Sequence, residues 1–208
     1  MKLTRRLVIT AGLCAGFAGT AWFAAAGNAS TSATHAAESR QAAKFTVDPV
    51  HSAAIFGIQW MEMTPFYGQF GDFSGTVSYD GSNPASFSCD VSVPVESIDS
   101  HNEGRDRHLK SPDFFNAREY PNITFKSTGL TDNGDGTWTL KGNLGMHGQE
   151  KPIEAKLTHL SVKQGPQGGT RCGFSTELNI KRSEWRVGPQ QGLGDDVKLM
   201  ISIQSASE

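Results

Sequence analysis

The chain carries a period-two alternation of apolar and polar residues that recurs from residue 45 almost to residue 205. Residues 52–60 show it well, because Phe56, Ile58 and Trp60 fall on one face of an extended segment. Such alternation is typical of β-strands with one buried face. It predicts about eight or nine strands, at residues 45–47, 52–60, 68–79, 85–97, 122–130, 137–146, 151–163, 171–181 and 197–204.

Turn-forming residues separate these segments, and one stretch breaks the rhythm. The predicted turns, rich in Gly, Asn, Asp and Pro, are residues 80–84, 132–136 and 164–169. The excursion is residues 99–115, where polar residues 100–103 resemble a helix cap and Glu103 precedes Arg107 by one helical turn. A short polar helix is therefore expected there.

Many antiparallel strands with frequent turns form either a sandwich or a closed barrel. The number of large apolar residues that share one strand face favours an all-β antiparallel barrel of about eight strands with a short helical excursion. A barrel of this size is either filled by its own side chains or hollow enough for one elongated ligand. The alternation leaves both possibilities open.

The first 43 residues have a different composition from the rest. Lys2, Arg5 and Arg6 precede an uncharged run at residues 7–26, which predicts a secretory signal peptide at residues 1–26 with cleavage somewhere in 26–37. A retained membrane anchor is the alternative, which the glycines of the run disfavour. The Arg5-Arg6 pair suits either twin-arginine or general secretory export. Residues 27–43 lack large apolar side chains and are expected to be a flexible tether to a folded domain at 44–208.

The charge of the exported domain narrows its partners. Of the 19 Lys and Arg residues, three lie in the leader, which leaves 16 against 21 Asp and Glu. A net negative domain is a poor ligand for nucleic acid and is not drawn to anionic lipid by its charge. Its two cysteines, Cys89 and Cys172, share the apolar faces of their strands, so we expect buried free thiols and keep a disulfide as the alternative.

Polar residues that resemble catalytic or metal sites occur in the chain, but each has a structural explanation. Asp48, His51 and Ser52 include hydrolase residue types, yet no Gly-x-Ser-x-Gly turn is present, and hydrogen bonding at a strand end is expected instead. His101, His108 and His147 are scattered without the spacing of zinc ligands. We therefore predict no catalytic residue, no metal site and no enzyme activity.

Eight segments, taken in order, carry a family resemblance. They are residues 48–52 (DPVHS), 68–75 (GQFGDFSG), 95–100 (VESIDS), 105–115 (RDRHLKSPDFF), 120–125 (YPNITF), 142–148 (GNLGMHG), 181–185 (KRSEW) and 194–199 (GDDVKL). With these segments the domain resembles the YceI-like family. The resemblance implies a lipocalin-like barrel that encloses a long isoprenoid chain, such as a polyprenyl quinone or polyprenol.

The expected ligand contacts follow from strand parity and from the Phe-Phe pair after the helix. They are Phe56, Ile58, Trp60, Val91, Val93, Phe114, Phe125, Leu140, Leu144, Phe174, Leu178 and Leu199. Trp60 departs from the family pattern, which often has His there, and Met146 also departs from it. Trp60 is expected either at the mouth of the lumen or as a filler of the barrel end.

The segment 105–108 has two interpretations. It is either a solvated helix face whose charges pair locally, which we favour, or a polar collar around the barrel mouth that orients a ligand head group.

The sequence thus predicts a periplasmic or secreted protein that sequesters or carries an isoprenoid lipid and has no other cofactor. The alternative is a structural or stress-related periplasmic barrel with a packed interior. A transient membrane contact and a homodimer stay open as further partners.

Overall fold

A computed structural model describes residues 41–166, 168–189 and 192–207 of the chain. The predicted leader and most of the tether lie outside the described residues. The strands of the single sheet are β1 (Ala43–Val47), β2 (Ala53–Trp60), β3 (Thr64–Phe70), β4 (Ser74–Tyr79), β5 (Ser88–Pro94), β6 (Ile98–Asp99), β7 (Asn122–Asp132), β8 (Trp138–Met146), β9 (Gln149–Gln164), β10 (Thr170–Lys181) and β11 (Leu193–Ala206). All their pairings are antiparallel.

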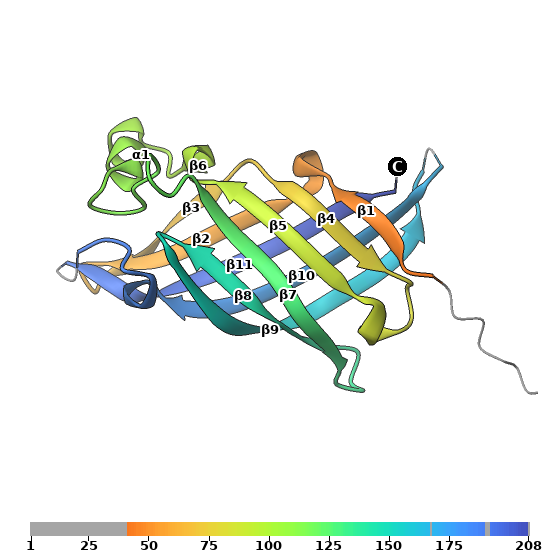
Figure 1. Ribbon diagram of the computed structural model, residues 1–208. Helices are drawn as coiled ribbons and strands as arrows, with labels where there is room; N and C mark the ends of the chain where they lie inside the picture. Colours follow the sequence, from red (N-terminus) through yellow and green to blue (C-terminus); the bar gives the residue numbers. More distant parts are fainter. Residues whose placement is uncertain (1–40, 167, 190–191, 208) are drawn as a thin grey trace, which may run out of the picture. The chain divides into compact units, whose positions relative to one another are not determined.

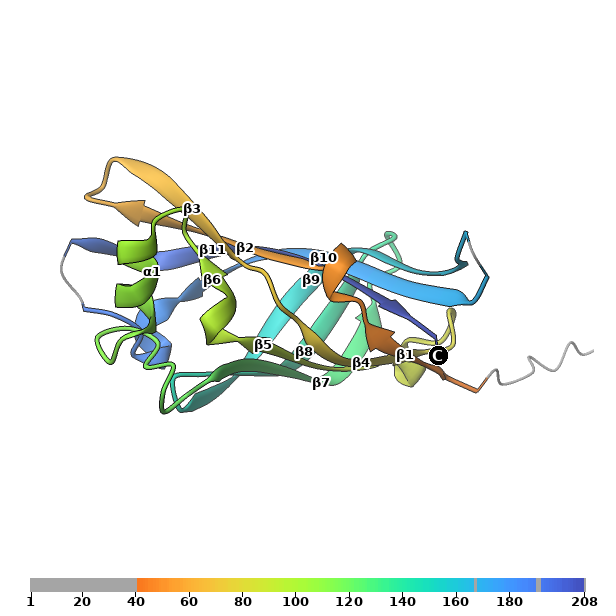
Figure 2. The ribbon, with the colours of Figure 1, turned by 90° about the horizontal axis from the view of Figure 1, so that it is seen from above.

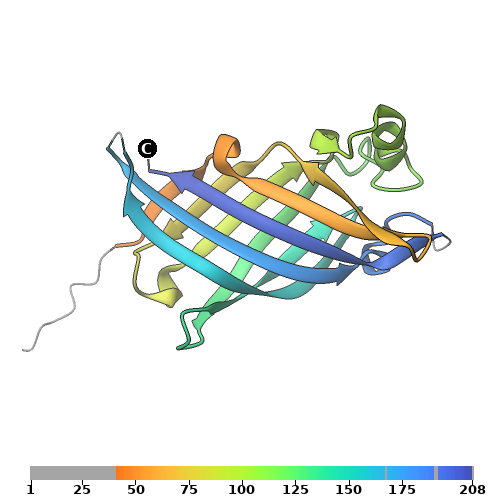
Figure 3. The same ribbon diagram turned by 180° about the vertical axis from the view of Figure 1, so that it is seen from behind.

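The sheet closes on itself because β1 pairs with β4 on one side and with β11 on the other (Figure 1). Strands β1 and β2 lie end to end along β11, with the short 3-10 helix η1 (Pro49–His51) between them. Strands β3 and β4 continue one another in the same way, so the closed wall has eight strand positions (Figure 3). The predicted all-β barrel of about eight strands is confirmed.

One end of the barrel is less tightly paired than the other. Pairing of β5 with β7 ends at Pro94 and Asn122, and beyond it the described pairings join β6 to β3 alone. The chain between β6 and β7 contains α1 (Glu103–Lys110), which lies at this end (Figure 2). Asn102 caps the helix by accepting a hydrogen bond from the Arg105 backbone N–H, and Glu103 pairs with Arg107 at 3.8 Å. The predicted helix is therefore confirmed.

The opposite end, where β1 and the C-terminal part of β11 meet, is densely packed. Phe45, Val77, Leu157 and Cys172 are almost completely buried there, and the Phe87 ring packs edge-on against Tyr79 and Phe174. Well-packed apolar groups of this kind supply most of the stability of a domain. We call this the packed end, and the end that carries α1 the helical end.

Two details of the strands differ from expectation. The predicted strand at residues 68–79 is two strands, β3 and β4, which are separated by residues 71–73. The predicted strand at 85–97 is shortened to β5 by 3-10 helices at Pro84–Ser86 and Val95–Ser97. Both breaks let the wall change direction. In the described part of the chain, no helix has the length and apolarity needed to cross a bilayer.

Candidate functional site

A cavity of about 560 Å³ occupies the helical end of the barrel. Its walls come from β2, β3 and β11, from α1 with the Phe114-Phe115 pair that follows it, and from the connection between β10 and β11. Apolar side chains make up most of the lining, and pockets of this size and character are typical of small-molecule sites. We call this the outer cavity.

A second cavity of about 130 Å³ lies deeper, toward the packed end. It shares Phe70, Ile123 and Leu199 with the outer cavity, so the two adjoin inside one lumen. Its described lining residues are apolar apart from Thr124 and Thr176. We call it the inner cavity. Together they form a tapering apolar interior rather than a packed core.

The structure brings the twelve expected ligand contacts together around these cavities. Those on the outer cavity are Phe56, Ile58, Trp60 and Phe114; those on the inner cavity are Val91, Val93, Phe125, Leu140, Leu144, Phe174 and Leu178; Leu199 lines both. That a ligand touches them stays a prediction. Their common location follows from strand parity, because one face of every strand points to the same interior.

Two glycines make room for aromatic rings inside the lumen. A Cβ on Gly68 would lie 2.3 Å from Cζ of Phe56, and a Cβ on Gly142 would lie 2.3 Å from Cζ of Phe125. Because neither glycine has a side chain, each ring lies flat against the backbone of a neighbouring strand. The cavity volume therefore depends on glycine as well as on the large side chains.

The polar part of the outer cavity includes Arg105 and His108 of α1. The Arg105 guanidinium donates to Oγ of Ser100 at 2.9 Å and to the Ser100 carbonyl, and its Cζ lies 4.2 Å from the centroid of the Phe66 ring. Asp106 accepts hydrogen bonds from the backbone N–H and the hydroxyl of Ser100. The charges of this segment do pair locally, as favoured, but two of its side chains also line the cavity.

Arg182, at the start of the 3-10 helix η4 (Arg182–Trp185), is the buried charge of this site. Its side chain lines the outer cavity, and the residue is only 4 % exposed. Its guanidinium donates to three backbone carbonyls: Nε to Gly194 at 2.8 Å, Nη1 to Val187 at 2.8 Å and Nη2 to Leu193 at 3.0 Å. These bonds fix the connection that forms one side of the cavity.

The tip of the β2–β3 hairpin forms an apolar rim beside the outer cavity. Trp60 is 54 % exposed and Met63 is 73 % exposed, yet both also line the cavity. The turn residues between them, Met61 and Glu62, both have positive φ angles, of 51° and 57°. Trp60 therefore lies at the mouth of the lumen and does not fill the barrel end.

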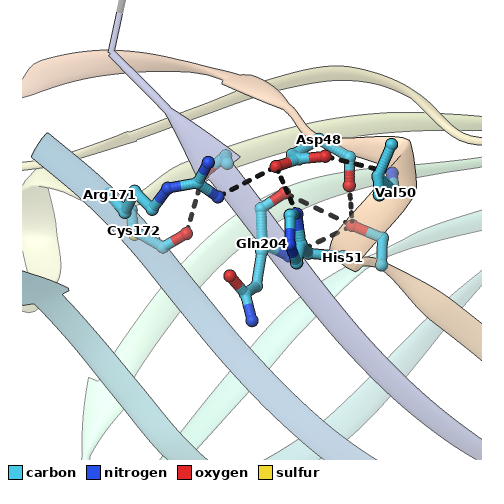
Figure 4. A network of polar contacts seen from close by, with 8 residues as sticks. Asp48, Val50, His51, Arg171, Cys172 and Gln204 are labelled. Carbon is cyan, nitrogen blue, oxygen red and sulfur yellow. Dashed lines mark hydrogen bonds and ion pairs between the residues drawn. The ribbon is translucent and has the colours of Figure 1, made fainter. Parts of the chain in front are cut away.

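The residues that resemble a hydrolase site instead hold a strand junction together (Figure 4). Oδ2 of Asp48 accepts from Nη1 of Arg171 at 2.9 Å and lies 2.8 Å from Nδ1 of His51. The Ser52 hydroxyl donates to the Asp48 carbonyl at 2.7 Å and accepts from the Gln204 backbone N–H at 3.1 Å. Since Ser52 is not bonded to His51, the arrangement is not that of an activated nucleophile. The expected strand-end role is what the geometry shows.

Comparison with known proteins decides the family. The model of the YceI-like domain matches residues 45–205. The chain belongs to the YceI-like family. Protein YceI of Escherichia coli O17:K52:H18 is 33 % identical over 175 residues, which cover 83 % of this chain and 91 % of that protein.

Solved structures with the same fold include two that this YceI-like barrel resembles closely in shape. BcnA of Burkholderia cenocepacia has a TM-score of 0.67 at 25 % identity, and the match covers 76 % of this chain and 98 % of BcnA. A domain from Saccharophagus degradans, described as polyisoprenoid-binding and implicated in plant cell wall breakdown, has a TM-score of 0.62 at 14 % identity and covers 79 % and 98 % of the two chains. At that identity the second match establishes the fold alone.

Sequence reasoning missed several residues of this YceI-like site. Arg182, Val187 and Leu193 line the outer cavity from the connection between β10 and β11. Phe66 and Met63 lie on a stretch that gave no strand signal. The only signal that could have marked Arg182 is its place in the KRSEW segment of the family resemblance. Period-two alternation identifies the inward face of a strand, but it carries no information on where a connection folds back.

The cysteines of the YceI-like barrel are both free and buried, as expected. Burial raises the pKa of each thiol to about 12. A thiol with such a pKa stays protonated near neutral pH and is a weak nucleophile. Cys89 lines the inner cavity as a small apolar group. Among the described residues, no group of three or more His, Cys, Asp or Glu side chains is arranged to hold a metal ion.

Proposed function

We propose that this protein sequesters or carries a long-chain isoprenoid lipid in the lumen of its barrel. The observation that carries the proposal is the pair of adjoining apolar cavities, of about 560 and 130 Å³. Burial of each methylene-sized group stabilises a complex by about 0.8 kcal/mol. Several isoprene units would therefore give tight binding without a catalytic group.

The fold neighbour from Saccharophagus degradans, described as a polyisoprenoid-binding domain, agrees with this choice of ligand. The competing function was a structural barrel with a packed interior. A hollow helical end argues against it, since empty apolar space of this size is costly unless a ligand fills it. The leader at residues 1–26 supports a periplasmic or secreted location.

The exposed hairpin rim suggests how the lipid is loaded. Trp60, Met61 and Met63 are continuous with the cavity lining and point an apolar edge into solvent. Trp and Met side chains insert readily into the interfacial region of a bilayer. We include a transient contact of this rim with the membrane in the proposal. A homodimer that covers the rim instead would appear as a concentration-dependent mass in solution.

The test is to purify the protein from its native host, extract it with organic solvent and identify the lipid by mass spectrometry. Leu199→Trp should abolish the bound lipid because Leu199 lines both cavities where they join. Lys198→Trp is the matched control, since Lys198 precedes it on β11 and pairs outside with Glu177 at 2.7 Å. Absence of an isoprenoid from the wild-type protein, or equal lipid in both folded variants, would contradict the proposal.

A further inference from the structure

The outer cavity contains positive charge that no carboxylate of its lining balances. Its described lining residues include Arg105, His108 and Arg182 and no Asp or Glu. The described domain as a whole is net negative, so this is a local feature of the cavity. We propose that the ligand is an amphiphile whose head group is anionic, with phosphate or carboxylate oxygens held by these arginines. The proposal rests on the proposed function and specifies its ligand class.

Arg182 supplies a positive charge that is already desolvated. In the described part of the chain, no carboxylate lies within ion-pairing distance of its guanidinium, and its printed partners are neutral carbonyls. The nearby Asp195 is occupied by the backbone N–H and hydroxyl of Ser183, at 2.9 and 2.8 Å. An arginine stays protonated in proteins. A buried charge without a counter-ion is costly, and an anion entering the cavity would offset that cost.

Arg105 supplies a second charge, at the mouth. Its Nε and Nη2 atoms are held by Ser100, and its guanidinium lies over the Phe66 ring, so the side chain is fixed in place beside the cavity. Ser100 is in turn held by Asp106. Among the described residues, Nη1 has neither an ion pair nor a hydrogen bond that competes with a ligand. A guanidinium fixed in this way is suited to donate to an anionic oxygen.

The arrangement needs both parts of the ligand. The apolar lumen favours a long hydrocarbon chain, and the arginines favour a negative end at the helical end of the barrel. A free phosphate ion has no chain to bury and would remain in water, where its hydration is strong. A neutral alcohol of the same chain would bury its chain but gain no charge-assisted hydrogen bonds.

The experiment compares geranylgeranyl phosphate with geranylgeraniol, which have the same chain and differ in the head group. Binding of each to the exported protein is measured by titration calorimetry at low and high salt. We expect the phosphate to bind about tenfold more tightly or better, a preference that falls with added salt. Arg105→Gln should reduce the preference about tenfold. Arg107→Gln, which removes the same charge from a 76 % exposed side chain on the same helix, should leave it unchanged.

The outcomes separate the two proposals. Equal binding of the phosphate and the alcohol overturns the anionic head group and leaves isoprenoid binding intact. A preference that Arg105→Gln does not change also overturns the inference, as does displacement of geranylgeranyl phosphate by millimolar inorganic phosphate. Failure of both probes to bind overturns the proposed function itself.

Discussion

Asp48 shows how a single carboxylate can hold the seam of this barrel. It lies between β1 and β2, and its side chain joins Arg171 of β10 to His51 and the Val50 backbone N–H of η1. The hydrogen bond from Arg171 is the main cause that lowers the pKa of Asp48 to about 2, and His51 and the Val50 N–H add to it. The seam closes a pairing between β1 and β11 that spans only a few residues.

The lowered pKa predicts an acid-sensitive seam. The carboxylate stabilises the fold fully above its unfolded pKa of about 3.9, and this stabilisation is lost as the pH falls through the folded pKa of about 2. Asp48→Asn should lower the free energy of unfolding at pH 7 by about 1–3 kcal/mol, and should flatten its pH dependence between about pH 4 and 2.

Chemical denaturation at a series of pH values measures both effects. Asp90→Asn is the control, because Asp90 is an exposed carboxylate of β5 with no ion pair in the described part of the chain. If both variants had the same pH profile as the wild type, the stabilising role of the Asp48 network would be wrong.

The β2–β3 hairpin is the element that sequence reasoning described least well. Two-residue turns with positive φ at both positions usually contain Asn or Gly, whereas here the residues are Met61 and Glu62. The sequence therefore gave no turn signal, and β3 was expected to begin at residue 68 rather than at Thr64. The inward parity of Trp60 was still predicted, since it depends only on β2.

The exposure of Trp60 predicts that it acts in binding more than in stability. Trp60→Ala should weaken isoprenoid binding and slow its uptake from vesicles, while the free energy of unfolding changes by less than about 1 kcal/mol. Ligand transfer can be followed by fluorescence and stability by urea denaturation. A loss of about 3–5 kcal/mol with binding intact would instead identify Trp60 as a core residue.

Tyr67→Ala is the matched control for that variant. Tyr67 is 50 % exposed on β3 of the same hairpin, and its ring lies beside Gly57 without lining either cavity. We expect this substitution to leave both lipid uptake and affinity unchanged. Equal loss in the two variants would mean that the hairpin, rather than its cavity-facing side, is what the ligand requires.

For the whole molecule, the sequence predicted the barrel and its inward faces but not its hollowness. Parity places Phe125 and Leu140 on the inside, yet it does not say whether facing side chains meet. That depends on distances across the barrel and on glycines such as Gly68 and Gly142, which accommodate rings. The connection that carries Arg182 could not be placed either, because its position depends on contacts between residues distant in sequence.

Export is the prediction that concerns the whole chain, and it falls on residues outside the described ones. If the twin-arginine route is used, replacing Arg5-Arg6 with Lys-Lys should block export, so that the unprocessed chain accumulates in the cytoplasm. Cell fractionation with N-terminal sequencing measures this, and cleavage is expected within residues 26–37. Unchanged export of the Lys-Lys chain would assign it to the general secretory route.

The contrast between the packed end and the helical end gives the barrel a direction. Phe45, Val77 and Leu157 close one end, whereas the lumen widens toward α1 at the other. A chain-shaped guest in such a dead-end channel must go in tail first and come out head first. Its reactive terminus is then the part on display throughout transit, so an acceptor can recognise the cargo, and compete for it, before any of the tail is exposed to water.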